Sequence, residues 1–248
     1  FISQKLFVKI FLKKLVSFFY KIGLTNAEKI FFQNYDDLNY FLQNNIISKN
    51  NYTVNTLGSG VNLKHFYYSK MSTDKHSFLM ISRLLPEKGI FEYLNVVKNL
   101  NINQNNIEFT LVGNYEDNHP KNKAINQLIR ESKVNYIKYK KDIRPLIEKH
   151  NVIVLPSYRE GMPRTLLEGM AMGKAIITTN VPGCKETVIN GYNGYLIKPG
   201  DVKDLEKAIL KICDFVKLEK MGKNSREVAE KKFDVNFVNN LIINEIGL

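Results

Sequence analysis

Residues 152–171 read VIVLPSYREGMPRTLLEGMA, and they are the most informative segment of the chain. Its first four residues form a short apolar run, which is typical of a buried parallel strand. Pro163 is expected as the first residue of the following helix, because its φ is already helical and its missing N–H would be unpaired there. Glu160 then lies in the loop at the carboxyl end of the strand, and Glu168 about one and a half turns into the helix. Ligands of open α/β sheets bind at this edge.

The two carboxylates of this stretch, Glu160 and Glu168, suit a ligand rich in hydroxyl groups. A carboxylate can accept two hydrogen bonds from a vicinal diol. The alternative is a surface loop acid followed by a solvated helix acid, which is the ordinary fate of a single Glu. The spacing alone leaves both interpretations open.

Strands alternate with helices along the rest of the chain, which predicts a doubly wound parallel sheet in an α/β protein. In the larger unit we expect strands at 77–82, 107–112, 134–139, 152–155, 175–179 and 195–197. Its expected helices span 89–100, 121–132, 143–150 and 201–213. The first 66 residues predict helix 1–22, strand 29–33, helix 36–45 and strand 52–57, and more helix is expected from Val216 onward. The first part therefore fits the last βα units of a separate Rossmann-like domain.

Composition narrows the function classes. The chain has 248 residues, a formal net charge of +12 and two cysteines, Cys184 and Cys213, whose spacing indicates neither a disulfide framework nor a zinc site. The basic residues are scattered and no nucleic-acid-binding motif occurs, so we expect no nucleic-acid partner. A basic protein also suits an anionic diphosphate ligand or an anionic membrane surface.

Several motifs in one order resemble the retaining glycosyltransferases of the large nucleotide-sugar-dependent family four, which have the two-domain GT-B architecture. The Glu160–Glu168 segment carries the resemblance. Further matching segments are Ser82–Gly89 (SRLLPEKG), Gly173–Thr179 (GKAIITT), Val181–Val188 (VPGCKETV) and Asn190–Leu196 (NGYNGYL). Together they cover about residues 55–212 in register, which makes the signal far stronger than a lone glycine motif.

The resemblance implies a division of the chain. Residues 1–66 would be the C-terminal part of an N-terminal, acceptor-side Rossmann-like domain. Residues 67–234 would form the Rossmann-like domain that binds the nucleotide sugar, and residues 235–248 a last helix that crosses back to the N-terminal domain. The chain starts with Phe1 rather than Met, so we expect an N-terminally truncated enzyme.

The resemblance also assigns roles to single residues. Arg83 and Lys88 would clamp the diphosphate of the donor, and Glu160 would face the donor sugar close to the reacting centre, so these three are the candidate catalytic residues. Glu168 would bind the ribose hydroxyls. The donor site would be completed by residues from three further segments: Gly113, Arg144, Gly161, Met162 and Pro163.

The implied reaction is retaining transfer of a hexose or N-acetylhexosamine from a nucleotide sugar, for which we expect UDP. The acceptor would be lipid-linked or a surface glycan in bacterial polysaccharide biosynthesis, such as capsule or lipopolysaccharide. No Asp-x-Asp motif or ligand-spaced cluster occurs, so we expect no cofactor and a metal-independent enzyme. Two alternatives stay open: a nucleotide-sugar 2-epimerase of the same architecture, and a non-catalytic nucleotide-binding module.

Residues 1–22 combine a basic face with an apolar one. The lysines are Lys5, Lys9, Lys13 and Lys14, and the apolar face carries Phe7, Ile10, Phe11, Leu15, Phe18 and Phe19. This pattern predicts an interfacial helix, and an ordinary helix that packs on another domain fits equally well. No run of 18 apolar residues occurs that could span a bilayer. The two unpaired cysteines are expected as reduced thiols of a cytoplasmic protein, and the first helix would give it peripheral contact with the inner face of the bacterial plasma membrane.

Overall fold

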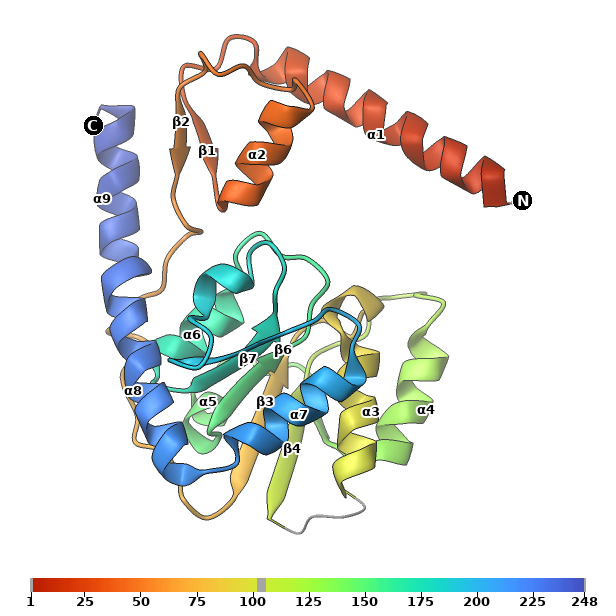
Figure 1. Ribbon diagram of the computed structural model, residues 1–248, viewed down its shortest axis with the longest axis vertical. Coiled ribbons are helices and arrows are strands. Elements are labelled where there is room, and N and C mark those ends of the chain that lie inside the picture. The colour runs from red at the N-terminus through yellow and green to blue at the C-terminus, as the bar shows by residue number, and fades with distance from the viewer. Residues whose placement is uncertain (1, 102–105, 248) are drawn as a thin grey trace.

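The computed structural model describes residues 2–101 and 106–247, which form a small N-terminal lobe, a large α/β lobe and a C-terminal helix that runs beside both (Figure 1). The large lobe is built on a six-stranded parallel sheet in the order β5-β4-β3-β6-β7-β8. Its strands are β3 (His76–Ile81), β4 (Ile107–Val112), β5 (Asn135–Ile137), β6 (Val152–Leu155), β7 (Ala175–Thr179) and β8 (Gly194–Ile197). The doubly wound sheet predicted from the alternation is confirmed.

The order of the strands places a topological switch point between β3 and β6. The chain builds outward from β3 through β4 to β5, and then returns to the other side of β3 with β6. Both central strands are buried on both faces, as the apolar runs predicted: every residue of β6 is at most 3% exposed. Beyond the loops that follow β3 and β6, the chain continues into α3 on one face of the sheet and α6 on the other, and ligands of open α/β sheets bind at such a point.

Helices cover both faces of this sheet. On one face α3 packs against α4 and α7, and on the other α6 packs against α8 (Figure 1). The helices are α3 (Ile90–Asn101), α4 (Asn122–Ser132), α5 (Arg144–Lys149), α6 (Arg164–Ala171), α7 (Val202–Ile212) and α8 (Phe215–Lys232). Short 3-10 turns occur at Pro86–Lys88 and Lys185–Thr187.

The helix after β6 begins one residue later than predicted. Pro163 has an extended backbone conformation (φ −75°, ψ 109°) and caps α6, so Arg164 rather than Pro163 is the first helical residue. The Pro163 carbonyl accepts hydrogen bonds from the N–H groups of Leu166 and Leu167, which is the role of the residue that precedes a helix.

The N-terminal lobe holds α1 (Ile2–Leu24), α2 (Tyr35–Gln43) and a two-stranded parallel sheet of β1 (Ile30–Phe32) and β2 (Thr53–Asn55). Its small core contains Ile30, Phe32 and Ile47. An isolated two-stranded sheet is marginally stable in water, so the lobe depends on its contacts with the helices and with the large lobe.

The C-terminal helix α9 (Val235–Ile246) connects the two lobes. Two backbone hydrogen bonds join the start of this helix to the segment after β2. The Val61 N–H donates to the Phe233 carbonyl at 2.7 Å, and the Val235 N–H donates to the Val61 carbonyl at 3.0 Å. Near its end, Glu245 forms an ion pair with Lys29 at 3.5 Å. The helix therefore runs from the large lobe to the side of the β1–β2 sheet (Figure 1).

Candidate functional site at the carboxyl edge of the central strands

The loops that follow β3 and β6 lie against each other at the switch point. The Tyr158 N–H donates to the Glu87 carbonyl at 2.9 Å. Gly89 ends the 3-10 turn with φ 74°, and a Cβ there would lie 2.1 Å from the Pro156 carbonyl oxygen. Only glycine therefore lets the two loops approach so closely.

Lys88 and Glu160 meet between these loops as a bidentate ion pair. The Lys88 Nζ lies 2.7 Å from Oε1 and 2.8 Å from Oε2 of Glu160. The two side chains are only 19% and 14% exposed. The buried Ser157 hydroxyl donates a further hydrogen bond of 2.7 Å to Glu160 Oε1. The sequence predicted that Lys88 binds the diphosphate and Glu160 the sugar, whereas in this structure the two side chains bind each other.

Arg83, the other predicted diphosphate ligand, lies on the same edge but points elsewhere. Its side chain is 66% exposed and its Nη1 lies 3.4 Å from Glu116 Oε2. The structure thus pairs Arg83 with Glu116 and Lys88 with Glu160 instead of directing both cations to one point. An exposed arginine is free to turn toward a bound anion at little cost, because a surface ion pair contributes only about 0–1 kcal/mol.

Glu168 lies apart from Glu160, in a separate cavity of about 390 Å³ beside the segment after β2. Its side chain is 9% exposed, and Arg164 lies 3.5 Å away, one turn earlier on α6. Burial raises the pKa of the Glu168 carboxyl to about 7, although the charge of Arg164 works in the opposite direction. Near neutral pH this carboxyl therefore exists in both protonation states.

Two further predicted site residues, Gly113 and Arg144, follow β4 and begin α5. A Cβ on Gly113 would lie 1.8 Å from the Ser82 carbonyl oxygen, so the ends of β3 and β4 require glycine there. Arg144, the first residue of α5, forms an ion pair with Asp142 at 2.7 Å, and hydrogen bonds from this arginine lower the pKa of Asp142 to about 2. The Arg144 Nη1 also lies 3.4 Å from Nδ1 of His65, and His65 lines the cavity that contains Glu168.

Gly161, Met162 and Pro163 carry the chain from Glu160 into α6. Within the described part of the chain, neither the Gly161 nor the Met162 N–H has a hydrogen-bond acceptor. Backbone N–H groups just before a helix favour anionic or other oxygen-rich ligands. The Met162 side chain is buried against Gly58 and contributes packing.

The first turn of α2 joins the Glu160 loop to the N-terminal lobe. Asn34 Nδ2 donates to the Gly161 carbonyl at 2.9 Å, Asp37 pairs with Arg159, and Asp36 pairs with Lys185 at 2.8 Å. These residues were not predicted, because each partner lies more than 100 positions away in the sequence. Ser157 was also missed, although it belongs to the quoted stretch.

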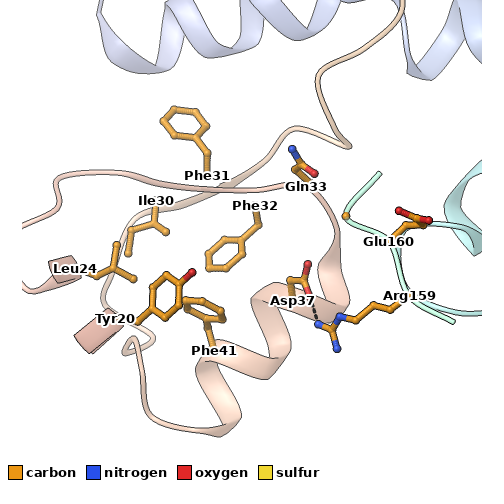
Figure 2. Close-up of a pocket in the computed structure, with 11 residues that line it drawn as sticks. Tyr20, Leu24, Ile30, Phe31, Phe32, Gln33, Asp37, Phe41, Arg159 and Glu160 are labelled. Carbon is orange, nitrogen blue, oxygen red and sulfur yellow. Dashed lines mark hydrogen bonds and ion pairs between the residues drawn. The ribbon is translucent and has the colours of Figure 1, made fainter. Parts of the chain in front are cut away.

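A cavity of about 680 Å³ opens between the lobes beside this junction. Aromatic and aliphatic side chains from α1, β1 and α2 gather on one side of it, and Arg159 and Glu160 lie on the other (Figure 2). The apolar members are Tyr20, Leu24, Ile30, Phe31, Phe32 and Phe41. Glu160 therefore lies at the switch point and also lines an amphipathic cavity.

Among the described residues, no group of three or more His, Cys, Asp or Glu side chains could hold a metal ion. Each helix within residues 2–101 and 106–247 is too short or too polar to span a bilayer.

Comparison with known proteins places these features in a family. The profile of the family described as Glycosyl transferases group 1 matches residues 66–228, well over half of the chain. The chain is 30% identical over 233 residues to the N,N'-diacetylbacillosaminyl-diphospho-undecaprenol alpha-1,3-N-acetylgalactosaminyltransferase of Campylobacter jejuni. It is 29% identical over 174 residues to the UDP-Gal:alpha-D-GlcNAc-diphosphoundecaprenol alpha-1,3-galactosyltransferase of Escherichia coli. These matches cover 88% and 64% of this chain but 60% and 42% of the two relatives, so the chain spans about half their length.

Solved structures show the same fold. HepE from Anabaena in complex with UDP and glucose matches 89% of this chain and 63% of its own at 21% identity, with a TM-score of 0.79. Sucrose-phosphate synthase from Thermosynechococcus elongatus matches 91% of this chain and 59% of its own at 24% identity, with a TM-score of 0.77. Structural similarity at this level confirms the GT-B fold that the motifs predicted.

Proposed function

Because the chain belongs to the group 1 glycosyl transferases, we propose that it transfers a hexose or N-acetylhexosamine from a UDP-sugar to a lipid-linked glycan, with retention at the anomeric carbon. The observation that carries this proposal is the Lys88–Glu160 pair at the switch point, with Glu160 also facing the cavity between the lobes. A cation for a diphosphate and a carboxylate for sugar hydroxyls lie together where open α/β sheets bind ligands.

For the donor, Lys88 and Arg83 would bind the two phosphates, and Glu168 would accept hydrogen bonds from the ribose hydroxyls. Solved structures with this fold contain UDP. During transfer the bond between the sugar C1 and the phosphate oxygen breaks, and its electron pair passes to the leaving diphosphate. The fixed positive charges stabilise that developing negative charge. We therefore propose that transfer proceeds without a divalent metal ion.

For the acceptor, the cavity between the lobes provides a polar end at Glu160 and Arg159 and an apolar end at β1 and α2. Two relatives are named as acting on diphospho-undecaprenol-linked sugars. An acceptor hydroxyl would attack C1 on the face that the diphosphate leaves, and its proton would pass to a leaving phosphate oxygen. Such a route leads to retention and needs no protein nucleophile.

The chain would act on the inner face of a membrane that carries its acceptor. Helix α1 exposes many large apolar side chains (Ile10, Phe11, Leu12, Val16, Phe18 and Phe19 among them), with Lys13 and Lys14 between them. Its Lys5 and Lys9 side chains lie outside the described residues. Apolar side chains that enter the interface and lysines that face anionic headgroups together favour peripheral binding.

The same proposal includes the division into domains: residues 1–66 and α9 would belong to the acceptor side, and residues 67–234 to the donor side.

The test is a panel of nucleotide sugars offered to the full-length protein with a lipid diphosphate sugar acceptor, with and without EDTA. We expect a glycosylated lipid from one UDP-sugar in both conditions, with much less product from the Arg83→Ala and Glu168→Ala variants. An epimerised nucleotide sugar formed without acceptor, or full activity of both variants, would contradict the proposal.

A further inference from the structure

Glu160 is held by two donors of different kinds. Lys88 is a cation with three N–H donors on a flexible stem, and it donates to both carboxylate oxygens. Ser157 is neutral, 0% exposed, and donates to Oε1 alone at 2.7 Å. Its own carbonyl accepts a hydrogen bond from the buried Thr179 hydroxyl on β7, so the serine is anchored to the sheet.

These two donors respond differently to an arriving diphosphate. An anion with two negative charges competes for the ammonium of Lys88, since charge-assisted bonds to phosphate are strong. It cannot reach the Ser157 hydroxyl, which has no exposed surface. When Lys88 turns to the phosphate, Ser157 is the donor that still holds Glu160.

Resting on the proposed function, we propose that Ser157 is a positioning residue that fixes Oε1 of Glu160 while the donor engages Lys88. The second oxygen, Oε2, is then released from Lys88 and becomes available to a hydroxyl of the transferred sugar. Without Ser157, the carboxylate would lose its fixed orientation at the moment when Lys88 leaves it. The serine acts through Glu160 and touches no reacting atom.

The competing explanation is that Ser157 only stabilises the loop, since its hydroxyl bonds a side chain three residues later. A double-mutant cycle separates the two. A residue that acts through the Glu160 carboxylate matters only while that carboxylate is present. A residue that stabilises the loop matters equally with Ala at position 160, where no side-chain acceptor is left for the serine.

The experiment measures sugar transfer by the full-length protein in the wild type, Ser157→Ala, Glu160→Ala and the double variant. We expect Ser157→Ala to lower kcat by about 10-fold to 100-fold, the effect of losing one hydrogen bond to a charged group. UDP affinity should stay unchanged, and the same substitution should have little effect in the Glu160→Ala background.

Ser225→Ala is the matched control, because Ser225 is also fully buried and donates to a backbone carbonyl, that of Asn193, at 3.2 Å. It should leave kcat unchanged. An equal loss from Ser157→Ala in both backgrounds, or no loss at all, would overturn the positioning role. Absence of transfer by the wild type would instead remove the proposed function on which that role rests.

Discussion

Replacing Glu160 with Gln should strengthen UDP binding while it impairs transfer. The Lys88 ammonium is neutralised by the Glu160 carboxylate, whose oxygens lie 2.7 and 2.8 Å away, and both side chains are largely buried. UDP must either displace this carboxylate or bind beside it. Two unit charges about 4 Å apart interact by about 4 kcal/mol at an effective dielectric constant of about 20.

The phosphate regains most of that energy when it takes the place of the carboxylate, so only part of it appears as affinity. We expect about 1.4 kcal/mol, or about 10-fold tighter UDP binding by Glu160→Gln. Transfer should fall by at least about 100-fold, because the sugar loses its charged hydrogen-bond partner. Binding can be measured by isothermal titration calorimetry and transfer by product formation.

Glu87→Gln is the matched control for this experiment. It removes one negative charge from the turn that carries Lys88, and Glu87 is exposed and forms no ion pair within the described part of the chain. Its UDP affinity should remain close to that of the wild type. Unchanged or weaker UDP binding by Glu160→Gln would refute the view that Glu160 and the diphosphate compete for Lys88.

Three further predictions follow from the site and the helix that precedes it. The pKa of Glu168 is raised from 4.5 to about 7, so its contribution to stability is present below pH 4.5 and is lost as the pH rises through 7. Relative to Glu168→Gln, the free energy of unfolding of the wild type should fall by about 3 kcal/mol between pH 4.5 and pH 8, as measured by urea denaturation; parallel pH profiles would contradict this. Gly113→Ala should destabilise the protein by about 1–3 kcal/mol and weaken UDP binding, because the added Cβ would clash with the Ser82 carbonyl. The control Gly23→Ala adds a Cβ in open space and should not lower the midpoint of thermal unfolding. The protein should co-sediment with anionic vesicles, and less so at high salt. Binding should be lost when four lysines of the first helix are replaced with Gln (Lys5, Lys9, Lys13 and Lys14). Equal binding to neutral vesicles would indicate that α1 serves only for packing.

The sequence predicted the large sheet well because its strands are short apolar runs bounded by turn residues. The ranges 107–112, 152–155 and 175–179 agree with β4, β6 and β7 to the residue. Buried parallel strands leave this pattern in any sequence, because both faces are covered by helices. The start of α6 was misplaced by one residue, since proline fits both the first helical position and, as here, the cap before it.

The pairing of the site residues could not be predicted in the same way. The motifs place Arg83, Lys88 and Glu160 at one edge of the sheet, but which cation meets which carboxylate depends on side-chain direction. Lys88 and Glu160 lie 72 positions apart and their loops touch only because of the sheet order. The contacts of α2 with the Glu160 loop have no local signal, since Asp36 and Asp37 read as ordinary first-turn acids of a helix.

The most direct test of the donor site is a crystal structure of the protein in complex with UDP. We predict that the diphosphate lies at the carboxyl ends of β3 and β6 within hydrogen-bond distance of Lys88 Nζ, with the ribose at Glu168 and Arg83 turned away from Glu116. UDP bound elsewhere, with the Lys88–Glu160 pair intact, would contradict the assignment of Lys88 to the diphosphate.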